Sequence, residues 1–391
     1  LFGDDLGIDD IIWTGPQPLI KNKAERVGIK RTESLSKLDS IIKEAADKGR
    51  QVHFLPQYRP EGVLKIEALL GIKSSSVNDN CSKKLIESVV EQRNVKINEE
   101  IEQIENALAV SYIMHTYAIK SAKPGIVESE IAGMIEGISL SYGGGLAFPV
   151  IFSVHGETLH NHFHGNLMKE GDIAINDSGA SSLMQYASDI TRTIPVSGKF
   201  SDRQKDIYKI VYDANMNSIE AIKPGIKFKD IHSIAAKTIA AGLKDLNLLK
   251  GDIDELVKQG AHAMFFPHGL GHMMGLDVHD MENLGENYVG YDETVKRSDQ
   301  FGTGYLRLAR KLLPGYVLTV EPGIYFIPEL IDLWKSEKKF ADFINYDEAE
   351  KYKDFGGVRI EDDVLVTHEG HRVLGKPIPK TVEEVEELAS S

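Results

Sequence analysis

Four carboxylates and one imidazole stand on separate segments of the chain, each inside a motif that suits a metal ligand. They are Asp177 in INDSGA, Asp189 in YASDITRT, His272 in PHGLGHMMGLDVHD, Glu321 in LTVEPGIYF and Glu361 in GGVRIEDDV. If the five converge, four like charges lie close together and cannot all stay ionised without compensation. Two divalent cations would supply the four positive charges required. The sequence therefore predicts a two-metal hydrolase, in which two cations make a bridging water acidic.

Most acidic residues of a soluble protein are solvated surface groups, so the surroundings of these carboxylates matter. Asp177, Glu321 and Glu361 each end or interrupt an apolar, strand-like run. An unpaired charge there would cost on the order of several kcal/mol. The acidic run EEVEELA near the C-terminus instead predicts a solvated helix face. The three strand-associated carboxylates are the ones that need a partner.

The histidine segment offers further polar groups. His268 lies four residues before His272, and His279 lies seven after it. If the segment is extended, His268 and His272 share a face. Glycines at 269, 271 and 275 permit close approach of the backbone. We expect imidazoles that bind no metal to donate hydrogen bonds to a developing oxyanion.

A repeated sequence explains how distant carboxylates could meet. The tetrapeptide KPGI occurs at 123–126 and again at 223–226, each time between two helical patterns. A duplicated helix–helix–strand unit would bring one pair of carboxylates from each copy to a central site. Matches this short also arise by chance.

The predicted strands contain a second internal repeat. Gly171 is followed six residues later by Asp177, and Gly315 is followed six residues later by Glu321. Both segments read as a turn and a buried strand. Asp177 and Asp189 are twelve residues apart, a spacing that suits the two strands of a hairpin.

The first 92 residues have a different character. Apolar runs such as DDIIWTG and QVHFLP alternate with helical patterns, which predicts strands and helices of an α/β layer. A polar break at 74–80 precedes a predicted helix through LIESVVEQR. From Asn98, the expected N-cap, a long amphipathic helix follows. We place the domain boundary between residues 92 and 93.

Composition limits the class of protein. The chain has 391 residues, of which 42% are hydrophobic and 27% charged, which suits a soluble globular protein of about two or three domains. No apolar run is long enough to span a bilayer, and no signal-peptide pattern is present. Because the chain opens directly on LFGDDLGIDD, we expect an upstream segment of the first domain to be missing.

Charge and cysteine content restrict the partners. The net charge of −14, from 45 basic and 59 acidic residues, argues against nucleic acid or an anionic membrane as partner. The single Cys81 permits no internal disulfide and no cysteine-based zinc finger. It is compatible with a reducing compartment, so we expect a cytoplasmic protein.

The motifs HGLGHMMGLDVHD, LTVEPGIYF and GGVRIEDDV, preceded by DSGA and SDITRT, resemble the signatures of the metal-dependent creatinase/aminopeptidase superfamily. Within it the chain is similar to prolidases (Xaa-Pro dipeptidases) and Xaa-Pro aminopeptidases, over nearly its whole length. The resemblance implies an α+β fold. Residues 93–391 would form a pita-bread catalytic domain with pseudo-twofold symmetry, preceded by a partial α/β creatinase-like domain over 1–92.

The resemblance also implies metal ligands. Asp177 would bind one metal, His272 and Glu321 the other, and Asp189 and Glu361 would bridge the two. The family usually uses manganese and also accepts cobalt or zinc. Glu321 is in addition the residue expected to shuttle the proton of the nucleophilic water.

The remaining site residues follow from the same resemblance. His160, in ETLHNH, matches a substrate-site histidine, and His268 and His279 match those that hold the scissile carbonyl and stabilise the tetrahedral intermediate. Arg359 matches an arginine that steadies the site. Arg307, in YLRLARKLL, matches the arginine that clamps the substrate's free carboxylate in animal-type prolidases.

These matches predict hydrolysis of the peptide bond before proline in Xaa-Pro dipeptides. Arg307 and the long segment 326–355 favour this dipeptidase, whereas GETLHNH departs from the animal prolidase pattern. The first alternative is an Xaa-Pro aminopeptidase that releases the N-terminal residue from longer peptides. The second is a non-catalytic or creatinase-like member. Relatives are often homodimers, and we expect small proline-containing peptides as partners.

Overall fold

The computed structural model describes residues 1–391 and forms two compact units, Leu1–Ser88 and Val89–Ser391. The first unit contains α1 (Ile8–Thr14), α2 (Ile20–Arg26), α3 (Leu38–Asp47), α4 (Pro60–Leu70) and the start of α5 (Lys83–Asn94). The predicted boundary between residues 92 and 93 lies within α5 and stays a prediction. No helix in the structure has both the length and the apolar character needed to cross a membrane.

The α/β layer predicted for the first 92 residues is wrong. No strand precedes Ile151, and the segment has only an isolated bridge between Phe2 and Glu33. The run IIWT lies inside α1, whose first turn carries Asp9 and Asp10, as suits the positive end of a helix. Apolar runs this short do not separate strand from helix by periodicity, whereas the two aspartates favour helix.

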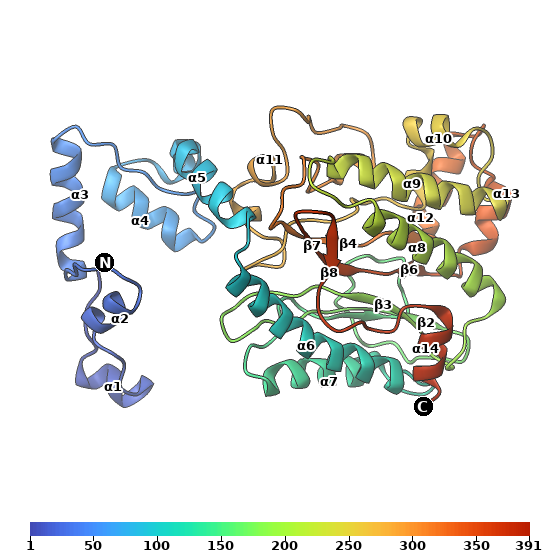
Figure 1. Cartoon of the computed structure of the whole chain (residues 1–391), viewed down its shortest axis with the longest axis horizontal. Coiled ribbons are helices and arrows are strands. Elements are labelled where there is room, and N and C mark those ends of the chain that lie inside the picture. Colours follow the sequence, from blue (N-terminus) through green and yellow to red (C-terminus); the bar gives the residue numbers. More distant parts are fainter. The chain divides into compact units, whose positions relative to one another are not determined.

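The second unit places its strands between two helix pairs (Figure 1). One pair is α6 (Asn98–Ser121) with α7 (Glu128–Ser141), and the other is α8 (Asp202–Glu220) with α9 (Phe228–Asp245). The antiparallel sheets are β1-β2-β3, β4-β7-β8 and β5-β6. Their strands are β1 (Ile151–Ser153), β2 (Ile173–Asp177), β3 (Thr191–Pro195), β4 (Val317–Val320), β5 (Gly323–Tyr325), β6 (Gly357–Arg359), β7 (Asp362–Val366) and β8 (His371–Val373).

Shorter helices complete this unit. They are α10 (Ile253–Gln259), α11 (Glu286–Val289), α12 (Pro328–Ser336), α13 (Tyr346–Ala349) and the C-terminal α14 (Val382–Ala389). The long helix α6 was predicted with Asn98 as its N-cap. Asn98 is instead its first residue, and Ile97 holds the cap position, where its N–H donates to the Glu100 carboxylate at 2.9 Å. A glutamate three residues on can satisfy the cap backbone without a polar cap side chain.

The two KPGI turns occupy equivalent places. Gly125 joins α6 to α7 with φ 89°, and Gly225 joins α8 to α9 with φ 87°. The Gly125 N–H donates to the Met168 carbonyl at 2.9 Å, and the Gly225 N–H donates to the Leu312 carbonyl at 2.8 Å. Each turn thus ties its helix pair to the segment just before a carboxylate-bearing strand. This agrees with the predicted duplicated unit.

The strands then deliver the carboxylates in pairs. In the first half β2 ends on Asp177, which pairs with Thr191 at the start of β3, two residues after Asp189. In the second half Val320 at the end of β4 pairs with Asp362 at the start of β7. The neighbours of this pair are Glu321 and Glu361. Each antiparallel pair therefore presents two carboxylates at one of its ends, as the hairpin argument predicted for Asp177 and Asp189.

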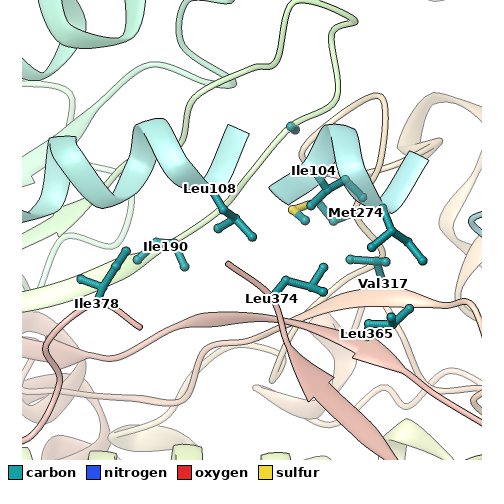
Figure 2. Close-up of a cluster of buried hydrophobic side chains, with 10 residues drawn as sticks. Ile104, Leu108, Ile190, Met274, Val317, Leu365, Leu374 and Ile378 are labelled. Atoms are coloured by element: carbon teal, nitrogen blue, oxygen red, sulfur yellow. The ribbon is translucent and has the colours of Figure 1, made fainter. Parts of the chain in front are cut away.

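A buried apolar cluster supports this arrangement (Figure 2). Side chains from α6 face side chains from the strands and from the segments beside the carboxylates. The cluster contains Ile101, Ile104, Leu108, Ala187, Ile190, Met274, Val317, Leu365, Leu374 and Ile378. Ile190 follows Asp189 directly, and Met274 lies two residues after His272. Burial of these neighbours, each contributing on the order of 1.5–3 kcal/mol, fixes the backbone from which the ligands project.

Gly271→Ala tests the close approach on which this backbone depends. A Cβ at Gly271 would lie 2.0 Å from the Thr319 carbonyl oxygen, and that backbone belongs to β4. We expect the variant to lose about 3 kcal/mol of stability and a large part of its activity, measured by thermal unfolding and peptide hydrolysis. Gly133→Ala in α7 is the control, since its Cβ meets nothing within 4 Å. Equal melting temperatures for the two variants would contradict the argument.

Candidate metal centre

The segment that carries His272 lies extended along β4. The Thr319 N–H donates to the His272 carbonyl at 3.0 Å, and the Glu321 N–H donates to the Leu270 carbonyl at 2.8 Å. Gly271, between them, lets the two backbones approach. The segment is therefore extended at His272, and the pairing brings His272 beside Glu321.

Three ligand types meet at the centre of the site. Ligand atoms of Asp189, His272 and Glu361, all buried, lie within 4.8 Å of one another. The His272 Nε2 lies 3.3 Å from an Asp189 oxygen and 3.5 Å from a Glu321 oxygen. On the other side of the ring, Nδ1 lies 3.1 Å from the Met273 carbonyl oxygen, so Nδ1 must carry the proton. Nε2 then turns a lone pair toward carboxylates, an arrangement that suits a shared cation.

Burial controls the charge of these groups. It raises the pKa of Asp189 and of Glu361 well above their usual range, and the neighbouring carboxylates raise both further. Burial likewise raises the pKa of Glu321 to about 7. Burial lowers the pKa of His272 well below its usual value, which keeps the imidazole neutral. Without a cation, protons must take up part of this negative charge.

Asp177 completes the carboxylate set from the first half. Its Oδ2 accepts a hydrogen bond from Arg359 at 2.5 Å, whereas Oδ1 of Asp177 and Oδ1 of Asp189 are buried without a partner. Buried unpartnered carboxylate oxygens are costly. Hard oxygen donors with one neutral imidazole are a donor set that divalent cations accept. The residues present therefore fit a divalent metal.

The two halves are joined beside these ligands. The Thr191 hydroxyl donates to the Glu361 carboxylate at 2.6 Å, and the Glu361 N–H donates to the Thr191 carbonyl at 3.1 Å. Arg192, 1% exposed, donates to the Glu361 carbonyl at 2.7 Å and to Asp362 at 2.8 Å. The Asp189 N–H donates to Asp363 at 3.0 Å. Strand β3 of the first half and strand β7 of the second therefore fix each other's ligands.

His268 is held by a hydrogen-bonded chain. Its Nδ1 lies 2.8 Å from the Gly269 carbonyl oxygen and must donate to it, so Nε2 accepts from the Tyr325 hydroxyl at 2.9 Å. That hydroxyl accepts in turn from Arg359 at 2.8 Å. Burial lowers the pKa of His268 to about 3. The ring is therefore neutral and fixed in one orientation, with both nitrogens engaged.

The His279 ring packs against the ring of His272. The two rings are 4.4 Å apart and meet edge to face, and His279 Nδ1 lies 2.8 Å from a Glu282 oxygen. The next residue, Asp280, forms a buried ion pair with Lys96 at 3.0 Å and accepts from Arg93 at 2.5 Å. The Asp280 N–H also donates to the Met273 carbonyl at 3.0 Å. These contacts anchor the loop that presents His279.

A cavity of about 450 Å³ opens onto the carboxylates. All ten residues proposed from the sequence line it: His160, Asp177, Asp189, His268, His272, His279, Arg307, Glu321, Arg359 and Glu361. Part of its wall is apolar, from Phe148, Pro149, Ile151, Leu159 and Val278. The cavity thus offers a polar floor and an apolar flank to one small ligand.

Arg307 lies in a charged cluster on the cavity wall. Its NH1 donates to Glu282 and to Glu286, each at 2.6 Å. Arg297 donates to the other oxygen of Glu286 at 2.6 Å. Glu286 and Arg297 also line the cavity, as does His162. Glu286 and Arg297 were not predicted from the sequence, because nothing in their spacing marks them as site residues.

Two further residues were missed although their motifs were noticed. Tyr325 stands in LTVEPGIYF and Thr191 in SDITRT, and both contact site residues directly. A hydroxyl two to four residues from a predicted ligand was the available signal.

A family model matches this unit. Residues 102–368 match the model described as metallopeptidase family M24. The chain belongs to metallopeptidase family M24. The match covers both halves of the site, from α6 to the end of β7. The pita-bread fold that the sequence predicts for the catalytic unit is confirmed, because solved structures of this M24 fold match the chain along its whole length.

Curated M24 relatives fall into two activity classes. The chain is 37% identical to an Xaa-Pro dipeptidase of Rattus norvegicus over 81% of its own length, and it spans 63% of that relative. It is 32% identical to a protein named "Probable Xaa-Pro aminopeptidase" of Verticillium alfalfae, over the whole chain and 82% of the relative. A structure of an Escherichia coli aminopeptidase P variant in complex with substrate matches with a TM-score of 0.79 and 29% identity, covering 100% of this chain and 82% of that one.

Glu321→Gln tests the buried charge in metal-free protein. The pKa of Glu321 is about 7 in the fold and about 4.3 when unfolded, so between these values only the folded state holds the proton. The stability that protonation contributes is complete at low pH and is lost as pH rises through 7. Between about pH 5 and pH 8 we expect chelator-treated wild type to lose about 1–3 kcal/mol relative to Glu321→Gln, measured by urea unfolding.

With added divalent metal, wild type should instead become more stable than Glu321→Gln, because wild type would bind the cation more tightly. If the unfolding free energies of the two metal-free proteins change with pH in the same way, Glu321 does not have a raised pKa in the fold.

Proposed function

We propose that the chain is a metal-dependent peptidase that hydrolyses the bond before proline, with Xaa-Pro dipeptides as substrates. The observation that carries the proposal is the meeting of paired carboxylates from both halves beside His272 at one cavity. Its apolar flank suits a proline ring. The bond before proline is a tertiary amide without an N–H, so recognition must come from the groups around it.

We propose two divalent cations as cofactors, with manganese as the resident metal and cobalt or zinc as substitutes. Asp177, Asp189, His272, Glu321 and Glu361 would hold them. When bound, such cations lower the pKa of water and polarise a carbonyl oxygen. The unpartnered oxygens of Asp177 and Asp189 support this assignment.

The chain's own residues would then handle protons and orientation. Glu321 takes the proton of the attacking water and returns it to the leaving nitrogen, the general-base and general-acid role that a carboxylate can fill. His279 donates to Glu282 through Nδ1, and in its protonated form its Nε2–H would donate to the carbonyl oxygen as charge develops there. His268, whose orientation is fixed through Tyr325 and Arg359, lines the cavity and helps to position the scissile carbonyl. His160 lies at the cavity wall and orients the substrate.

Arg307 is the proposed clamp for a dipeptide's free carboxylate. Its NH1 is engaged by the two glutamates, which leaves Nε and NH2 to face a substrate. A planar guanidinium edge matches a carboxylate in a bidentate way. This geometry supports the dipeptidase reading.

A second candidate is an Xaa-Pro aminopeptidase acting on longer peptides. It is favoured by the same cluster, because Glu282 and Glu286 already neutralise Arg307. The Verticillium alfalfae relative and the Escherichia coli aminopeptidase P structure also align with the entire chain. We further propose a homodimer, which light scattering would test, and a cytoplasmic location, which is compatible with the lone Cys81.

Proline release from an Xaa-Pro dipeptide, with and without manganese, tests the proposal. We expect activity that a chelator abolishes and that Asp189→Asn lowers by a factor of about 100 or more. The surface variant Asp206→Asn is the matched control and should behave as wild type. Metal analysis of the same samples should show cation lost from Asp189→Asn alone. Full activity in the chelated protein would overturn the proposal.

Arg307→Ala separates the two candidate substrates. If Arg307 clamps a free carboxylate, kcat/KM should fall by about 10- to 100-fold on an Xaa-Pro dipeptide and much less on an Xaa-Pro tripeptide. Steady-state kinetics on both substrates measure this. Equal losses on the two substrates would remove Arg307 from the specificity argument.

A further inference from the structure

The charged cluster around Arg307 carries an inference about substrate class. We propose that Glu286 sets the preference between free dipeptides and peptides that continue or are amidated beyond proline, by neutralising the Arg307 guanidinium. This rests on the proposed function. Glu286 would thereby be a specificity-determining residue of the same site.

The contacts show how charge is distributed on this wall. Glu286 Oε1 accepts from Arg307 and Oε2 accepts from Arg297, both at 2.6 Å. Glu282 accepts from Arg307 at the same distance. Two arginines and two glutamates thus sum to zero charge. Arg307 therefore presents hydrogen-bond donors to the cavity but little net positive field.

The cluster is only partly shielded from water. Side-chain exposure is 31% for Arg307, 32% for Arg297 and 27% for Glu286. Charge interactions at such positions are weakened by solvent but not removed. A substrate carboxylate entering beside Arg307 would therefore feel repulsion from both glutamates.

A neutral end group behaves differently. A peptide or amide carbonyl can accept a hydrogen bond from the free edge of Arg307 without that repulsion. The neutralised arginine should therefore discriminate less between a free acid and its amide than an unpaired arginine would, and removal of one glutamate charge should favour the acid. Specificity here depends on the repulsive group as much as on the attractive one.

Glu286 is a cleaner position for a test than Glu282. Glu282 also pairs with His279 at 2.8 Å, so its substitution would disturb a group proposed to act on the carbonyl. Glu286 is hydrogen-bonded only through the two arginines. Glu286→Gln keeps the shape and removes the charge.

The experiment compares Ala-Pro with Ala-Pro amide, which differ only at the carboxylate. We expect Glu286→Gln to raise the acid-to-amide ratio of kcat/KM by about five- to tenfold, as suits one unit charge several ångströms away at a partly solvated site. In Arg307→Ala the acid-to-amide ratio should fall below that of wild type, because the cation is lost while Glu286 still repels the carboxylate. Glu255→Gln in α10, outside the cavity, is the matched control. An unchanged ratio in Glu286→Gln, or a ratio in Arg307→Ala no lower than in wild type, would overturn the inference.

Failure of the proposed function would look different. In that case wild type, loaded with manganese, would hydrolyse neither the acid nor the amide. Calorimetric Kd values for the same two probes then decide the inference, with the same five- to tenfold shift expected in the acid-to-amide ratio. Melting temperatures of all variants establish that each is folded.

Discussion

Repulsion among carboxylates in a water-poor interior is the constraint on which the rest of the structure depends. Asp189 and Glu361 are almost fully buried beside further acidic groups, so burial and like charge act in the same direction. Only protons or cations relieve such a site. The site has too few hydrogen-bond donors for its carboxylate oxygens. Thr191 and Arg359 each donate to one carboxylate, while other carboxylate oxygens have no partner.

The fold holds the mutually repelling carboxylates in place because each half carries its two carboxylates at the end of a rigid pair of antiparallel strands. Antiparallel strands place Asp177 beside Thr191 and Val320 beside Asp362, and α6 packs the apolar cluster behind them (Figure 2). Arg192 then bonds across to the second half. The charged centre is therefore held by backbone geometry rather than by attraction among the ligands themselves.

The sequence predicted much of this arrangement. The strand-terminal carboxylates and the repeated KPGI turn were enough to predict paired strands and one shared site, because strand ends and positive-φ glycines have strong local signatures. The glycines around His272 indicated a close approach of the backbone, which Gly271 makes to Thr319. By contrast, the first 92 residues misled, since a short apolar run such as IIWT fits either helix or strand.

Contacts between side chains far apart in sequence were not predictable. Tyr325 links His268 to Arg359, and Glu286 links two arginines, yet no local pattern announces either. Such pairings depend on how loops close over the cavity. Residue roles assigned by resemblance, such as those of His160 and Arg307, stay predictions although both residues line that cavity.

The interleaving of the two halves has a consequence for biosynthesis. A growing chain carries Asp177 and Asp189 long before Glu361 is made, so an early cation would find half a coordination sphere. Thr191 likewise has no carboxylate to donate to until Glu361 has been made. Stable metal retention thus reports that translation has passed β7 and that both copies have docked. A product truncated before Glu361 would hold Asp177 and Asp189 without the carboxylates that the second half supplies.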